Sequence, residues 1–322
     1  MATPTWLAYL RLFRIGNVFT AIADVAMGFV FVTVTQVSAP WAACVVAIIV
    51  SCLLYSAGMI LNDAFDAPID AEERPERPIP SGQVSRTRAF AVGFAMMAAG
   101  FLLALLIGRL VSGIAYTMRP AGITLGLVLS VLAYDSFLKK TPLGPLGMGA
   151  CRFFNVLLGM SAALPVVGET PRLWGFGGPE LMTAGGIGLY IVGVTWFART
   201  EARRSNRVSL SLALVTMIAG LSVLAAFPYV TTVEGRFAES LRTYGPLLFA
   251  LVGVVVVRRC IDAIIRPEPL QVQRAIKQSI LSLILFDASV CLAVAPDRPY
   301  YGLLVLALLG PTLFLGRWIA AT

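Results

Sequence analysis

Long apolar runs alternate with short polar segments along the chain. Each run is continuous, without the period-two alternation of a half-buried strand, and about 20 apolar residues are enough to cross a bilayer as a helix. A backbone inside lipid must satisfy its own hydrogen bonds, so continuous runs of this length predict helices. The pattern predicts ten spans, at residues 15–36, 41–61, 88–108, 120–138, 144–167, 181–198, 208–228, 244–262, 279–295 and 300–318.

The composition agrees with a membrane protein. The 322 residues are 58% hydrophobic and 13% charged, whereas a soluble domain carries about 25% charged residues. The first apolar run is too long for a signal peptide and lacks a small-residue cleavage site, so we expect no cleavable signal. No long linker, repeat or low-complexity segment divides the chain. We therefore expect an all-α polytopic membrane helical bundle, with residues 1–322 forming a single domain.

Basic residues are distributed unevenly between the two sets of loops. With both termini in the cytoplasm, eighteen Lys and Arg residues fall on the inner side and six on the outer side. The positive-inside rule therefore favours this orientation, and we expect the bacterial inner (plasma) membrane as the location. The net charge of +8 then reflects topology and contact with anionic lipid headgroups. Because the basic residues are spread over many loops, we expect no nucleic-acid partner.

An acidic cluster follows the second apolar run. Asn62, Asp66 and Asp70 are spaced i, i+4, i+8, as on one face of a helix, and Asp63 adds a third carboxylate. We expect Pro68 to end or kink this helix, which would leave Asp70 in a loop. Clustered hard oxygen ligands suit Mg²⁺, which also binds substrate phosphates. An ordinary acidic, solvated loop is the alternative interpretation.

Arginine and proline alternate directly after the acidic cluster. Arg74-Pro75 and Arg77-Pro78 lead into Ile79-Pro80-Ser81-Gly82. A guanidinium group is shaped to bind phosphate oxygens, so these cations beside a metal-binding pattern indicate a phosphorylated substrate.

The segment from Asn62 to Gly82 resembles the first motif of the UbiA superfamily of intramembrane prenyltransferases. Residues 11–17, Arg-Leu-Phe-Arg-Ile-Gly-Asn, and residues 134–140, Tyr-Asp-Ser-Phe-Leu-Lys-Lys, are also similar to that family. The resemblance covers about the first 210 residues. It implies a bundle of nine spans, or ten by the pattern above, around a cytoplasm-facing cavity. In such a cavity two acidic motifs hold Mg²⁺ against an isoprenyl diphosphate.

The resemblance also implies roles for particular side chains. Asp63, Asp66 and Asp70 are the expected catalytic residues. The expected metal ligands are Asn62, Asp66, Asp70 and Glu201. The expected substrate-binding residues are Arg77, Lys139, Lys140, Arg152, Asn155, Arg199, Arg203 and Arg204.

The second motif of the family is altered in this chain. Glu201 stands where its first aspartate belongs, and the later acids are replaced by Arg203, Arg204 and Ser205. Arginines could neutralise a diphosphate directly in place of a second metal ion. Alternatively, this segment is an ordinary positive-inside loop end. Residues 196–201, Trp-Phe-Ala-Arg-Thr-Glu, are similar to a divergent subgroup, the Ebo-type prenyltransferases.

Four polar residues fall within apolar runs, namely Asp24, Arg152, Asn155 and Asp287. Ionisable groups in a membrane usually face a cavity or one another. Arg152 could therefore reach a diphosphate or pair with Asp24 or Asp287, and Asn155 shares its helix face.

The resemblance implies Mg²⁺-dependent transfer of an isoprenyl group from its diphosphate to an unidentified acceptor, for which a polar compound is a candidate. One alternative is transfer of a phosphosugar or cyclitol phosphate to a polyprenyl phosphate. Another is a non-catalytic protein that binds lipid phosphates. The expected partners are an isoprenyl diphosphate or polyprenyl phosphate and membrane lipids.

Overall fold

The computed structural model describes residues 5–34, 39–111, 118–164, 173–202, 204–230 and 236–321. Within these ranges the chain is helical and forms no strand. Three of its helices are α3 (Trp41–Glu73), α5 (Arg119–Ser136) and α6 (Gly144–Ser161). The others are α1 (Thr5–Leu12), η1 (Ile15–Asn17), α2 (Val18–Thr33), α4 (Arg86–Val111), η3 (Leu138–Lys140), α7 (Gly178–Ala198), α8 (Arg207–Val230), α9 (Arg236–Ile265), α10 (Pro269–Val294), α11 (Tyr300–Ala307) and α12 (Leu309–Ala321).

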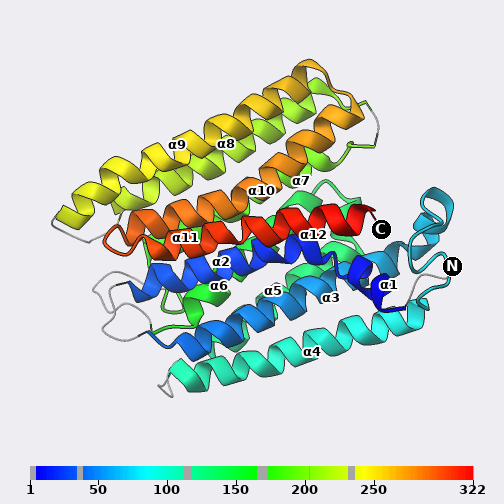
Figure 1. Cartoon of the computed structure of the whole chain (residues 1–322), viewed down its shortest axis with the longest axis horizontal. Coiled ribbons are helices and arrows are strands. Elements are labelled where there is room, and N and C mark those ends of the chain that lie inside the picture. The colour runs from blue at the N-terminus through cyan, green and yellow to red at the C-terminus, as the bar shows by residue number, and fades with distance from the viewer. Residues whose placement is uncertain are drawn as a thin grey trace.

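The long helices run side by side as one bundle (Figure 1). Helices α8 and α9 form one edge of the view, and α4 forms the opposite edge. The start of α1 and the end of α12 lie at the same end of the bundle as the connection from α3 to α4. The segments after α7 and after α9 meet, since the backbone N–H of Ser205 donates to the carbonyl of Pro267 at 3.0 Å. The loops predicted to share one membrane side are therefore at one end.

Six of the described helices are long and apolar enough to cross a membrane, namely η1 with α2, α3, α4, α7, α8 and α10. A shorter apolar stretch covers Tyr300–Gly316. The predicted all-α membrane bundle is confirmed, while the total of nine or ten spans stays a prediction.

The helix α3 does not end at Pro68, so the expectation of a break or a loop-borne Asp70 is wrong. A proline within a helix has no N–H to give to the carbonyl four residues earlier, here that of Ala64. The guanidinium Nε of Arg86, at the start of α4, donates to this carbonyl at 2.8 Å. Because a side chain replaces the missing bond, the helix continues for one more turn and carries Asp70 on it.

Because the Arg86 side chain replaces a backbone hydrogen bond that Pro68 cannot form, the effects of mutating Arg86 and Pro68 on stability should be coupled. Arg86→Met should destabilise the protein by about 1 kcal/mol, because the carbonyl of Ala64 loses its donor. In a Pro68→Ala background the new backbone N–H can satisfy that carbonyl, so the same Arg86→Met change should cost much less. A double-mutant cycle of unfolding free energies measures this difference. Equal costs in both backgrounds would contradict the role given to Arg86.

Glycines allow the central helices to approach closely. A Cβ atom at Gly188 of α7 would lie 3.0 Å from the carbonyl oxygen of Gly149 on α6, and one at Gly186 would lie 3.1 Å from that of Gly220 on α8. Such contacts between small residues are a common basis of helix packing in membranes. At the other end of the sequence, α10 packs against α2 and α7, and α12 packs against η1. We propose from these contacts that residues 1–322 form one domain.

Candidate functional site

Four polar side chains form a stripe along the last turns of α3. Asn62, Asp66 and Asp70 recur every four residues, and Asp63 adjoins them because it precedes Asp66 by three residues and Asp70 by seven. Asp63 and Asp70 are buried, with 6% and 4% of their surfaces exposed. We call these four residues the α3 stripe. Burying this many carboxylates on one face requires cations nearby.

Three cations from separate segments meet the α3 stripe. The Nη1 of Arg77 lies 2.6 Å from Asp70 Oδ2 and 3.4 Å from Asp63 Oδ1. Arg14 follows α1, and its Nη2 lies 3.4 Å from the same oxygen of Asp63.

Lys139 comes from η3, a segment far along the chain. Its Nζ lies 2.7 Å from Asp66 Oδ1 and 3.0 Å from the Asn62 Oδ1 that accepts its hydrogen bond. The structure thus brings together the first motif and two of the cations that the sequence predicted to accompany it, Arg77 and Lys139. Arg14 was part of a recognised segment but was not expected in the site.

The donor set of the α3 stripe fits a magnesium ion that shares its ligands with a substrate. Among the described residues, no three His, Cys, Asp or Glu side chains are arranged to hold a metal by themselves. Magnesium usually keeps several waters and takes one or two carboxylates plus phosphate oxygens. Asp66 and Asp70, with the amide oxygen of Asn62, match that requirement for one ion.

Glu201, the remaining acid of the altered second motif, lies just after α7 and is half-buried. Partial burial raises the pKa of its carboxyl, while the positive charges of Arg74 and Arg14 act in the opposite direction. Glu201 therefore faces the same cationic region as the α3 stripe. A single carboxylate in this segment supplies fewer metal ligands than the two or three acids of the family motif.

The other basic residues predicted to bind substrate make no ion pair with the α3 stripe among the described residues. Lys140, Arg199 and Arg204 are exposed, and Arg203 lies outside the described residues. Because they are exposed, Lys140, Arg199 and Arg204 can also contact anionic lipid headgroups.

A buried polar network lies deeper in the bundle. The Nη1 of Arg152 on α6 lies 2.8 Å from Asp24 Oδ2 on α2, and its Nη2 donates to Thr20 Oγ1 at 2.8 Å. Asn155, one turn further along α6, donates to the same Asp24 oxygen at 3.0 Å and to the carbonyl of Ala21 at 2.9 Å. Of the two pairings considered for Arg152, the structure contains the one with Asp24. Asp287 of α10 is fully buried beside Asp24.

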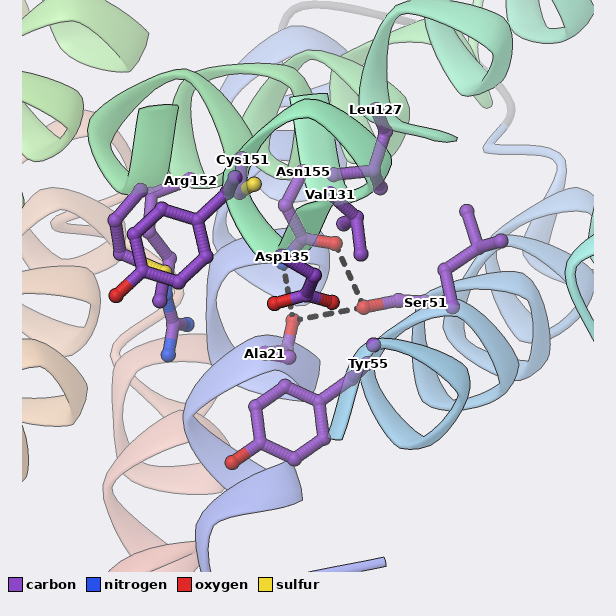
Figure 2. A pocket seen from close by; sticks show the side chains of 13 residues that line it. Ala21, Ser51, Tyr55, Leu127, Val131, Asp135, Cys151, Arg152 and Asn155 are labelled. Carbon is purple, nitrogen blue, oxygen red and sulfur yellow. Dashed lines mark hydrogen bonds between the residues drawn. The ribbon is translucent and has the colours of Figure 1, made fainter. Parts of the chain in front are cut away.

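A cavity of about 100 Å³ lies between α2, α3, α5 and α6 (Figure 2). Tyr55 and Gly58, which precede Asn62 on α3, place it directly on the membrane side of the α3 stripe. Its wall is mostly apolar, with Leu54, Leu127, Val131 and Met148 among its members. Its polar members include Ser51, Tyr55, Tyr134, Asp135, Arg152 and Asn155. An apolar chamber beneath a cluster of acids and cations suits a molecule with an apolar body and an anionic head.

Of the residues in this wall, only Arg152 and Asn155 were predicted as site residues, and Asp135 and Tyr55 are among those that were missed. Asp135 belongs to a recognised segment, and its place one turn before Lys139 was the available signal. Tyr55 had no such signal, because an aromatic residue within an apolar span is ordinary.

The fold is similar to two solved structures. One is a UbiA homologue from Archaeoglobus fulgidus bound to DMAPP and Mg²⁺, with a TM-score of 0.58 and 13% identity, covering 84% of this chain and 97% of that one. The other is the apo form of a UbiA homologue from Aeropyrum pernix K1, with a TM-score of 0.60 and 18% identity, covering 86% and 97%.

A curated relative is also similar in sequence. Digeranylgeranylglyceryl phosphate synthase of Methanospirillum hungatei JF-1 is 34% identical over 194 residues, which are 59% of this chain and 58% of that protein. The chain therefore matches less than two thirds of the length of this relative.

The sequence model of the UbiA prenyltransferase family matches residues 23–276. The match begins after the recognised N-terminal segment and extends through α8 and α9 into α10, well beyond the expected limit near residue 210. Together with the apolar helices, it indicates an integral membrane protein. Because the match covers most of the sequence, the chain belongs to the UbiA prenyltransferase family.

Proposed function

We propose that this protein transfers an isoprenyl group from an isoprenyl diphosphate to an acceptor within the membrane. One observation carries the proposal: the α3 stripe, with its cations Arg77 and Lys139, stands over an apolar cavity. A prenyl diphosphate has the same division between an anionic head and an apolar tail. Family membership supports this function, as does the structure of the A. fulgidus homologue bound to DMAPP and Mg²⁺.

In this proposal Asn62, Asp66 and Asp70 would hold Mg²⁺, with Glu201 as a further ligand from the segment after α7. The ion would neutralise charge on the departing diphosphate. Arg77 and Lys139 are already beside the acids, and they would exchange carboxylate oxygens for phosphate oxygens when the donor binds. Asp63 would orient Arg77 and Arg14 through its two ion pairs. The apolar wall of the cavity would keep water from the reactive end of the isoprenoid.

The acceptor is proposed from the relative's name. Digeranylgeranylglyceryl phosphate, the product in that name, is a glyceryl phosphate with two prenyl groups. The groups of glycerol that can receive a prenyl group are hydroxyls, so we propose an acceptor with a hydroxyl nucleophile and a phosphate. The exposed cations Lys140, Arg199 and Arg204, at the same end of the bundle, would attract such an anionic headgroup.

Release of diphosphate tests the donor. Purified protein should release inorganic diphosphate from geranylgeranyl diphosphate when Mg²⁺ and a glyceryl phosphate with one geranylgeranyl group are both present. Chelation of Mg²⁺ should stop the release. Turnover of a phosphosugar with a polyprenyl phosphate, and not of the prenyl diphosphate, would replace this proposal by phosphosugar transfer. Tight binding of the diphosphate without any turnover would indicate a lipid-phosphate binding protein.

Cysteine labelling tests the proposed orientation, with the site on the cytoplasmic side of the inner (plasma) membrane. Ser81 and Asn206 are exposed at the site end, whereas Ser205 is 6% exposed and is unsuitable for labelling. In a background without native cysteines, Ser81→Cys and Asn206→Cys should be shielded from an impermeant reagent in intact cells. Asp297→Cys, between α10 and α11, should react. Labelling of Ser81→Cys or Asn206→Cys from outside would contradict the orientation.

A further inference from the structure

The buried carboxyl group of Asp135 is not accounted for by the contacts that stabilise the bundle. Asp135 lies in the last turn of α5 and is 3% exposed. Its Oδ2 is buried without a hydrogen-bond partner among the described residues. Most buried polar atoms in proteins have such a partner, so an unpaired carboxylate oxygen requires another explanation.

Asp135 lines the cavity beneath the α3 stripe. In Figure 2 it is drawn among the side chains that line the cavity, together with Ser51 and Tyr55 of α3 and Asn155 of α6. One turn further along the chain, Lys139 contacts both Asp66 and Asn62. Asp135 is therefore placed on the membrane side of the proposed diphosphate site, where the first carbon of a bound isoprenoid would enter the cavity.

The other acids near the cavity are already paired with cations. Asp66 is bound by Lys139, and Asp70 is bound by Arg77. Asp24 is bound by Arg152. In contrast, no ion pair of Asp135 is present in the part of the chain that the structure describes. Asp24 also keeps one buried oxygen without a hydrogen-bond partner, but its other oxygen is bound by Arg152. Among these carboxylates, Asp135 is the one whose charge no described cation neutralises at ion-pair distance.

We propose that Asp135 is a catalytic residue that takes the proton of the acceptor, an inference that rests on the proposed prenyl transfer. The bond between the allylic carbon and the diphosphate oxygen breaks, and its electron pair leaves with the diphosphate. A lone pair of the acceptor hydroxyl forms the new carbon–oxygen bond. The hydroxyl proton moves to the Asp135 carboxylate, which later releases it to water. The step needs no further reactant.

The substitution Asp135→Asn tests this role, since it removes the proton acceptor and preserves the shape of the side chain. The matched control is Asp297→Asn, the same change at an exposed position between α10 and α11. Two rates are measured with geranyl diphosphate and Mg²⁺. One is transfer to a glyceryl phosphate with one geranylgeranyl group. The other is scrambling of a heavy-oxygen label from the bridging position of the diphosphate, which reports cleavage and re-formation of the donor bond without transfer.

Asp135→Asn should lower transfer by about a hundredfold or more, the usual range for loss of a general base. Scrambling should stay within about threefold of the wild-type rate, because cleavage of the donor does not need the proton acceptor. Asp297→Asn should match wild type in both rates.

Other outcomes separate the possible failures. Unchanged transfer in Asp135→Asn, with an active wild type, would refute the role of Asp135 and leave the proposed function intact. An equal fall in transfer and scrambling would also refute it, because Asp135 would then support the donor or the fold. A wild-type protein that neither scrambles nor transfers would refute the proposed function itself, and the role of Asp135 with it.

Discussion

Replacing Asp66 by asparagine should lower prenyl transfer by about a hundredfold or more, which corresponds to about 2.7 kcal/mol of barrier. Asp66 lies at the centre of the α3 stripe and is one of the two carboxylates of α3 proposed to hold the metal ion. Its loss also leaves Lys139 without its acidic partner at 2.7 Å. Asp70→Asn should have a similar effect, because Arg77 loses its partner at 2.6 Å. Steady-state rates at saturating Mg²⁺ measure both effects.

The control for these variants is Glu72→Gln, which removes an exposed acid from the same end of α3. It should retain the wild-type rate, and all three variants should keep the helical content of the wild-type protein. Full Mg²⁺-dependent activity in both Asp66→Asn and Asp70→Asn would show that the α3 stripe is not the metal site.

The second large effect concerns the ion pair between Asp24 and Arg152. Asp24→Leu should destabilise the protein by about 3–5 kcal/mol, because it leaves the Arg152 charge buried without its partner. Asp24→Leu combined with Arg152→Met should recover much of that loss, since a well-packed apolar pair can replace a buried ion pair. Unfolding of the purified protein by denaturant measures the two free energies.

The same pair of variants distinguishes two roles of Arg152. If Arg152 also contacts the donor diphosphate, as the sequence predicted, the double variant should be stable but bind the donor weakly. If the double variant recovers both stability and donor affinity, Arg152 is structural and the predicted contact is wrong. A double variant as unstable as Asp24→Leu would contradict the ion-pair interpretation itself.

Local spacing made the α3 stripe predictable. The four-residue repeat of Asn62, Asp66 and Asp70 depends only on helix geometry, and it holds in the structure. The course of α3 beyond Pro68 was not predictable in the same way. It depends on Arg86, a residue of the next helix, which supplies the donor that proline lacks. A local rule about proline could not anticipate a hydrogen bond from another element.

Two further features of the site depend on contacts between elements that are far apart in the sequence. The position of a charged residue within a long apolar run indicated that Arg152 needed a partner. Only the packing of α2 against α6 selects Asp24 over Asp287 as that partner. Similarly, Asp135 could be placed near Lys139 by its number, whereas its burial and its unpaired oxygen depend on how α5 packs against the cavity. The number of membrane spans depends on how the helices lie in the bilayer as well as on contacts within the protein.

The altered second motif gives this chain a distinct charge arrangement. Glu201 is the acid that remains there, and it is half-buried within reach of the charges of Arg14 and Arg74. The α3 stripe therefore supplies most of the carboxylate ligands in the proposed site. Cations from other segments would supply the remaining charge for the diphosphate.

The mass of the reaction product tests the central claim most directly. Wild-type protein is incubated with geranylgeranyl diphosphate, Mg²⁺ and a glyceryl phosphate with one geranylgeranyl group, and the lipids are analysed by mass spectrometry. We predict a product heavier than the acceptor by one geranylgeranyl group less one hydrogen, formed in equal amount with inorganic diphosphate and lost when Asp66 is replaced by asparagine. Diphosphate release without any prenylated product, or the same product from Asp66→Asn at the wild-type rate, would contradict the account.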